Sequence, residues 1–163
     1  MEKKNWEVNE ACNDMILCLD IWNNLVVACS KDNSIFIFRK TINEFVKEAV
    51  LLGHSDSVSS LCISPRSGAQ LVSGSADKSM KIWNLQGACS EIDTTAVNSS
   101  LATIAAHSKD INVVRYSPND KLIASGSQDK SIKIWDAKKL VPVGTLKGHK
   151  RGVWDVSFSP VEK

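Results

Sequence analysis

The sequence predicts an all-β protein built from repeated four-stranded units. Its apolar residues fall in short runs rich in β-branched and aromatic side chains, separated by Gly, Asn, Asp, Ser and Pro, and no stretch has the 3.6-residue period of a helix. One hairpin sequence occurs three times, at residues 29–39, 73–84 and 125–136. Self-similarity at long, regular spacing is the signature of a repeat architecture.

The composition is that of a chain with a packed core and without strong charge. The 163 residues are 43% hydrophobic and carry a formal net charge of +2, which is too small to steer association with nucleic acid. No apolar run approaches the ~20 residues of a membrane span, and the N-terminus has no apolar signal core, so we expect no membrane partner. Cys18, Cys29 and Cys62 fall inside strand patterns, which indicates buried thiols in a reducing compartment.

The first unit is expected at residues 14–52, after a polar and frayed segment at 1–13. Strands are expected at 15–21, 25–30, 35–39 and 45–52, with turns at 22–24 and 32–33.

The second unit is expected at 53–105 and the third at 106–147, while 148–163 supplies the first strand of a truncated fourth. A histidine opens each of them, at His54, His107 and His149, and a Ser-Pro pair follows at the same spacing. Apolar spacing after Val58, Ile111 and Val153 is too wide for plain alternation, which predicts a bulge in each first strand. The small polar residues 86–100 lengthen the second unit and predict a mobile surface loop.

The recurring G-H, S-P, S-G-S-x-D and I-W-D or I-W-N motifs resemble the WD-repeat β-propeller family. The resemblance covers residues 14–160 and implies a partial propeller of about three and a quarter four-stranded blades. Because this number of blades cannot close a ring, we expect an open arc with unpaired strand edges. In isolation such an arc should be marginally stable, and its missing blades should stabilise it.

The resemblance also implies a buried network in each blade, in which a histidine meets a turn aspartate and a strand serine links the histidine to a tryptophan. The residues carried over are His54, Ser73, Asp77 and Trp83 in the second unit, and His107, Ser125, Asp129 and Trp135 in the third. Ser75 and Ser127 face the same side as the chosen serines and are the alternatives. The first unit has no such histidine and has Phe38 in place of tryptophan, so we expect apolar packing alone to hold it.

A catalytic triad or a metal site is the other interpretation of these polar residues. The histidines occupy the same place in different units, and equivalent places of a propeller spread around a ring rather than converge. The cysteines lack the spacing of metal ligands. The sequence therefore predicts no enzyme, no catalytic residue, no cofactor, no metal and no small-molecule substrate.

In the family, the residue before the network aspartate and the residues beside the bulge project onto the narrow top face. The predicted partner-binding residues are Lys109, Asp110, Asn112, Gln128, Lys150, Arg151, Gly152 and Trp154. The corresponding residues of the second unit are Ser57, Ser59 and Ala76. The alternatives are a solvated loop for the basic cluster Lys147, Lys150 and Arg151, and packing of Trp154 on a neighbouring blade.

Three runs contain residues that a general WD repeat does not require: H-x-K-D-I-N, P-N-D-K-L and H-K-R-G-x-W. They are similar to the nucleolar WD-repeat subunits of the small-subunit processome, which are longer, so this chain would be a piece of such a protein. That implies a non-catalytic scaffold for pre-rRNA processing and small ribosomal subunit biogenesis in the nucleolus. Its partners would be other proteins of a ribonucleoprotein complex, and any RNA contact would be indirect. The alternative is a generic WD-repeat adaptor in ubiquitin-ligase or G-protein-like signalling.

Overall fold

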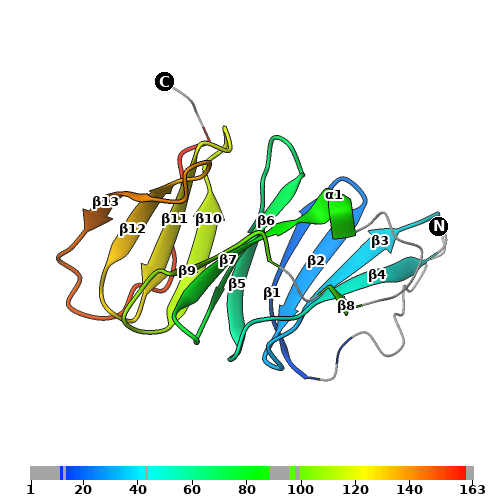
Figure 1. The fold of residues 1–163 in the computed structure, drawn as a ribbon, viewed down its shortest axis with the longest axis horizontal. Helices are drawn as coiled ribbons and strands as arrows, with labels where there is room; N and C mark the ends of the chain where they lie inside the picture. The colour runs from blue at the N-terminus through cyan, green and yellow to red at the C-terminus, as the bar shows by residue number, and fades with distance from the viewer. Residues whose placement is uncertain (1–11, 13, 43, 89–95, 98–99, 161–163) are drawn as a thin grey trace, which may run out of the picture.

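Three antiparallel sheets lie side by side as a fan in the computed structural model, which describes residues 12, 14–42, 44–88, 96–97 and 100–160 (Figure 1). Blade 1 comprises β1 (Ile16–Trp22), β2 (Leu25–Ser30), β3 (Ile35–Lys40) and β4 (Phe45–Leu51). Blade 2 comprises β5 (Val58–Ile63), β6 (Gln70–Ser75), β7 (Ser79–Asn84) and β9 (Ala102–Ala105). Blade 3 comprises β10 (Ile111–Tyr116), β11 (Leu122–Ser127), β12 (Ile132–Asp136) and β13 (Pro142–Leu146).

The first strands of the three blades, β1, β5 and β10, lie next to one another, and the later strands of each blade run outward from them (Figure 1). The described residues do not close into a ring. The prediction of an all-β, open arc of four-stranded units is therefore confirmed. The described part of the chain contains no helix long and apolar enough to cross a membrane.

The predicted bulges are present in the first strands of blades 2 and 3. The pairing register shifts between Val58 and Ser60 and again between Ile111 and Val113. Residues 148–160, where the sequence predicted a further first strand, pair with no strand among the described residues. Contacts with blade 3 include two hydrogen bonds of the Val153 backbone. Its N–H donates to the Ser127 carbonyl at 2.9 Å, and its carbonyl accepts from the Asn112 side-chain amide at 2.8 Å.

The expected loop at 86–100 holds regular structure at its described positions. Helix α1 (Leu85–Ala88) follows β7, and β8 (Ala96–Val97) pairs in parallel with β4, with Val50 opposite Ala96 and Leu51 opposite Val97. The insertion of blade 2 thus returns to the outer strand of blade 1. Pairing of this kind satisfies backbone groups that an edge strand otherwise exposes. Residues 89–95 and 98–99 lie outside the described part.

The hydrophobic core lies between the blades. One buried cluster joins the facing sides of blades 1 and 2, with Ile37 and Leu51 against Leu61 and Trp83. A second joins blades 2 and 3, with Met80 and Ile82 in the same cluster as Ile111 and Val114. Each such side chain contributes ~1.5–3 kcal/mol on full burial, so a blade depends on its neighbours for most of its stability.

Two strand glycines leave room for branched side chains that pack closely against their sheets. A Cβ built on Gly74 of β6 would lie 2.6 Å from Cγ2 of Ile111 and 2.9 Å from Cγ1 of Val114. A Cβ on Gly126 of β11 would lie 2.8 Å from both Val113 and Val153. These neighbours are buried and β-branched, so they have little rotamer freedom with which to yield.

Gly74→Ala should therefore destabilise the chain by about 1–3 kcal/mol through overpacking between blades 2 and 3. Gly144→Ala is the matched control, because a Cβ on Gly144 of β13 meets nothing within 4 Å. The measurement is the free energy of unfolding from urea titration. Equal free energies of unfolding for the two variants would contradict the close-approach explanation.

Candidate functional site

The predicted network residues of blade 2 form one continuous chain of hydrogen bonds. The Trp83 Nε1–H donates to Ser73 Oγ at 2.9 Å, and Ser73 Oγ lies 2.8 Å from His54 Nε2. His54 Nδ1 lies 2.7 Å from Asp77 Oδ2. An indole can only donate and a carboxylate can only accept. The neutral histidine must therefore carry its proton on Nδ1, and the serine hydroxyl must donate to Nε2.

Blade 3 repeats this arrangement with nearly the same geometry. The Trp135 Nε1–H donates to Ser125 Oγ at 2.9 Å, and Ser125 Oγ lies 2.8 Å from His107 Nε2. His107 Nδ1 lies 2.8 Å from Asp129 Oδ2. Both linking serines are completely buried, so each chain of hydrogen bonds runs through the interior of its blade. A fully satisfied buried network of this kind favours one conformation over others.

The aspartate at the end of each chain accepts hydrogen bonds from the histidine and from two serines. Besides the bond to His54, Asp77 accepts from the Ser55 N–H at 3.0 Å, the Ser79 N–H at 2.8 Å and the Ser79 hydroxyl at 2.6 Å. Asp129 accepts in the same way from Ser108 and Ser131. The sequence reasoning gave Ser79 and Ser131 no role, although a repeated Asp-Lys-Ser sequence could have indicated one.

These hydrogen bonds decide the charge state of the network. Burial raises the pKa of Asp77, but hydrogen bonds from Ser79 and His54 outweigh burial and lower the pKa to about 2. The pKa of Asp129 is lowered in the same way. Burial lowers the pKa of His54 and His107 and outweighs their bonds to the aspartates, which act in the opposite direction. Blades 2 and 3 thus each hold a carboxylate beside a neutral imidazole.

Ser75 and Ser127, the alternative serines, have a different structural role. The Ser75 hydroxyl donates to the Asp56 carbonyl at 2.9 Å and accepts from the Asp77 N–H at 3.0 Å. Ser127 does the same between Lys109 and Asp129, at 3.1 and 3.0 Å. These serines tie the hairpin turn to the loop that precedes the first strand, and they take no part in the link to tryptophan.

Blade 1 retains the hydrogen bonds of the hairpin turn but lacks the chain of histidine, serine and tryptophan. The Asp32 N–H donates to Ser30 Oγ and Asp32 Oδ1 accepts from the Ser34 N–H, as in the turns of the other blades. At the places of Ser73 and Trp83 stand Ala28 and Phe38, and both are buried in an apolar cluster with Phe36. The sequence predicted that apolar packing alone holds blade 1. The structure shows that its hairpin turn is also held by hydrogen bonds.

Serine, histidine and aspartate do meet within each complete blade at distances that resemble a hydrolase triad. The histidine side chains of both networks have no exposed surface, and the linking serines are equally inaccessible. Each serine oxygen is also occupied by an indole N–H. No substrate can reach such a nucleophile, so burial and the tryptophan, rather than separation of the residues, make these triads structural.

Three loops meet at the rim of blade 3, where the sequence predicted partner binding. We call this the three-loop surface: residues 108–112, 127–131 and 150–154. The Gln128 N–H donates to the Asp110 carbonyl at 3.0 Å, and the Val153 N–H donates to the Ser127 carbonyl at 2.9 Å. A Cβ on Gly152 would lie 3.1 Å from Gln128 Cα. The structure therefore brings all eight predicted partner-binding residues into one surface.

Their exposure within that surface differs. Lys109, Lys150 and Arg151 are exposed, and Trp154 is 71% exposed. Asp110, Asn112, Gln128 and Gly152 are half-buried. The Asn112 amide donates to the Val153 carbonyl at 2.8 Å, so it braces the last loop against blade 3.

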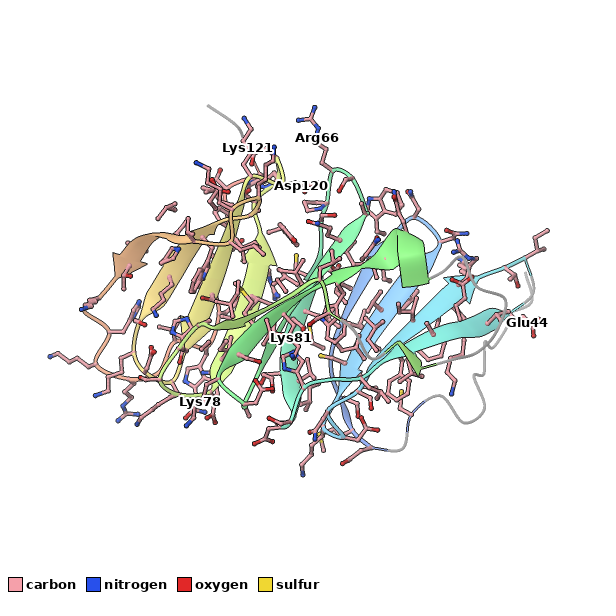
Figure 2. The ribbon with its side chains drawn as sticks, in the orientation of Figure 1. Glu44, Arg66, Lys78, Lys81, Asp120 and Lys121 are labelled. Atoms are coloured by element: carbon pink, nitrogen blue, oxygen red, sulfur yellow. The ribbon has the colours of Figure 1, made fainter. Side chains whose placement is uncertain are left out.

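The two rims of the arc differ in the residues they present. The hairpin turn of blade 2, with Lys78, lies on the rim opposite Arg66, Asp120 and Lys121 (Figure 2). On that opposite rim the Asp120 carboxylate accepts from the backbone N–H groups of Arg66 and Ser67, at 3.2 and 2.9 Å. Hydrogen bonds between the Asp120 side chain and the backbone of blade 2 thus join blades 2 and 3 there. Within the described residues, no three His, Cys, Asp or Glu side chains gather as a metal site.

Comparison with known proteins decides the family. The model of the family "WD domain, G-beta repeat" matches residues 45–84, 98–136 and 140–163, which are more than half of the chain. The chain belongs to the WD40 repeat family. Among solved structures, the crystal structure of RRP9 WD40 repeats superposes with a TM-score of 0.74 at 26% identity, over 86% of this chain and 41% of that one.

Two curated relatives agree with the resemblance found in the repeats. Transducin beta-like protein 3 of Mus musculus is 37% identical over 155 residues, covering 89% of this chain and 19% of the relative. U3 small nucleolar RNA-associated protein 13 of Saccharomyces cerevisiae is 33% identical over 162 residues, covering 93% of this chain and 20% of the relative. The chain therefore spans about a fifth of the length of these relatives.

Asp129→Ala should destabilise the chain by about 1–3 kcal/mol, because it leaves the buried His107 and the N–H groups of Ser108 and Ser131 without their acceptor. Asp110→Ala makes the same chemical change on the adjacent loop, and the carboxylate of Asp110 takes no hydrogen bond in the described structure. Thermal unfolding of the two variants is the measurement. An unchanged unfolding midpoint for Asp129→Ala would show that the hydrogen-bond network does not contribute measurably to stability.

Stability should fall as the pH falls below about 6.5, the ordinary pKa of histidine. Folding lowers the pKa of His54 and His107, so below pH 6.5 the unfolded chain binds more protons than the folded chain. The free energy of unfolding therefore decreases as the pH falls. A second loss should follow between pH ~4 and about 2 as the aspartates of the network are protonated.

Urea titrations at a series of pH values measure this dependence. His107→Gln should reduce the slope between pH 7.5 and 5.5, while His149→Gln, at an exposed position, should leave it unchanged. A slope of the opposite sign would show that folding raises these pKa values.

Proposed function

We propose that this chain is part of a non-catalytic protein-interaction scaffold of the small-subunit processome, acting in pre-rRNA processing and small ribosomal subunit biogenesis in the nucleolus. The observation that carries the proposal is the similarity over nearly the whole chain to transducin beta-like protein 3 and to U3 small nucleolar RNA-associated protein 13. The runs that exceed the general repeat, 107–112 and 149–154, supply two of the three loops of the three-loop surface.

A scaffold needs a surface whose shape survives without its partner, because ordering a loop on binding costs affinity. Backbone bonds from Gln128 and Val153 hold the three loops to one another. The buried network holds Asp129, and therefore the turn between Gln128 and Lys130, from below. The network residues thus contribute to binding indirectly, by fixing the turn that the surface is built on.

The exposed side chains of this surface are of the kind that dominates protein interfaces. Trp154 is 71% exposed and stands on the same loop as Arg151, and tryptophan and arginine lead the residues that carry binding energy. Lys109, Lys130 and Lys150 add positive charge around them. The partner we propose is an acidic protein segment that covers the indole and pairs with these cations.

Contact with RNA is proposed to pass through such protein partners. The net charge of +2 is small. The carboxylate of Asp110 lies among the basic residues of the three-loop surface, and Asp155 directly follows it in the chain. Direct binding of a phosphate backbone depends on many uninterrupted cation–phosphate contacts.

Purification of the tagged full-length protein from growing cells should recover processome proteins together with small nucleolar RNA. Treatment of the purified complex with ribonuclease should leave the direct protein partners bound. Recovery of ubiquitin-ligase or signalling components in their place would support the generic adaptor instead and sink the processome assignment.

The double variant Arg151→Glu and Trp154→Ala should reduce recovery of the direct partner at least tenfold, while its unfolding midpoint stays within the range of ordinary surface substitutions. Arg66→Glu and Lys121→Ala make comparable changes on the opposite rim (Figure 2) and serve as the control. Equal recovery with both double variants would exclude the three-loop surface as the binding site.

A further inference from the structure

Blade 1 carries a pair of cysteines on neighbouring strands. Cys18 of β1 and Cys29 of β2 are direct partners in the antiparallel register. We propose that Cys18 and Cys29 form a peroxide-reactive pair, in which Cys18 is oxidised first and Cys29 closes a disulfide across the β1–β2 hairpin. Both thiols are free in the reduced chain.

The strand geometry allows this bond without rearrangement. Directly opposed residues of an antiparallel pair have Cα atoms ~4.5–5.5 Å apart, and a disulfide accommodates Cα separations of about 4.4–6.8 Å. The Cys29 thiol is close enough to lower the pKa of Cys18. The register also shifts between Ile16 and Cys18, so Cys18 stands at the irregular start of the paired segment, where a strand adjusts most easily.

Accessibility and charge assign different roles to the two sulfurs. Cys18 is half-buried and lines a cavity of about 200 Å³ together with Asp20, Cys62 and Arg115, whereas Cys29 has no exposed surface. The hydrogen bond from the Cys29 thiol, with help from the Arg115 guanidinium, lowers the pKa of Cys18 to about 6 against the opposing effects of burial and Asp20. The thiolate is the form that attacks peroxide.

The chemistry balances with hydrogen peroxide as the oxidant. The Cys18 thiolate attacks one peroxide oxygen, the O–O bond breaks, and Cys18 becomes a sulfenic acid while the other oxygen leaves and is protonated to water. The Cys29 sulfur then attacks the Cys18 sulfur, the S–O bond breaks, and the hydroxide takes the Cys29 proton to form a second water. Two thiols and one peroxide give one disulfide and two waters.

Cys62 shares the cavity but lacks a partner thiol across its sheet. It lies on β5 opposite Val72, and its sulfur accepts a hydrogen bond from the Tyr116 N–H at 3.4 Å. Burial raises the pKa of Cys62 to about 11, so little thiolate forms there near neutral pH. Cys62 is therefore a matched control within the same cavity.

The test treats the folded full chain with a small excess of hydrogen peroxide, blocks remaining thiols, and digests with an endoproteinase that cuts before aspartate. Cuts before Asp14, Asp20 and Asp32 place Cys18 and Cys29 on separate peptides, 14–19 and 20–31, and leave Cys12 on a third. The expected product is the disulfide-linked pair of 14–19 with 20–31, which a reductant separates. A link from 14–19 to the peptide of Cys12 or Cys62, or no oxidation at all, overturns the proposal.

Cys29→Ala should stop the reaction at the Cys18 sulfenic acid, which dimedone traps on peptide 14–19. Cys62→Ala should leave both the rate and the product within twofold of the parent chain. Near-ultraviolet circular dichroism before oxidation checks that each variant is folded. Because Cys29→Ala also removes the thiol that lowers the pKa of Cys18, this variant is oxidised at pH 9, where a thiol of ordinary pKa is largely ionised. If the folded variant gave no dimedone adduct on peptide 14–19 at that pH, Cys18 would not be the reactive thiol.

Discussion

The buried bond between a histidine and the aspartate of a hairpin turn is the interaction on which each complete blade depends. It ends a chain that starts at a tryptophan on the third strand and crosses the second strand through a serine. Because the imidazole stays neutral and the carboxylate stays charged, every N–H and O–H donor in the chain has an acceptor. Strands far apart in the sequence are thereby held in one arrangement, and the turn that carries the aspartate is held with them.

That turn is also where the interior meets the interaction surface. In blade 3 the residues on either side of Asp129 belong to the rim, and backbone bonds from Gln128 and to Ser127 fasten the two flanking loops. The His107 side chain, which has no exposed surface, can therefore affect binding by holding Asp129 in position. Blade 1 keeps the turn but replaces the inner half of the chain with Ala28, Phe36 and Phe38. Polar bonds and aromatic packing are thus two ways of holding the same hairpin.

The space between blades imposes a second constraint. The core is made by facing blades, so each sheet needs residues on the facing side that leave room for the next. Gly74 and Gly126 provide this room, since a methyl group at either position would collide with branched side chains of the neighbouring elements. The insertion after β7 adds another link, because β8 pairs with the outer strand of the preceding blade.

The sequence by itself determined the repeat, the four strands of each complete unit, the bulges after Val58 and Ile111, and which residues recur at matched positions, because these depend on local pattern and spacing. Only the tertiary structure decided that Ser73 rather than Ser75 meets the tryptophan, since the two serines share a face and differ only in what lies across the blade. It alone showed that β8 returns to β4, that residues 148–160 attach to blade 3 through hydrogen bonds of the Val153 backbone, and that Cys18 lies opposite Cys29. Each of these depends on contacts between separate segments of the chain, and the local pattern of apolar residues does not specify which segments meet.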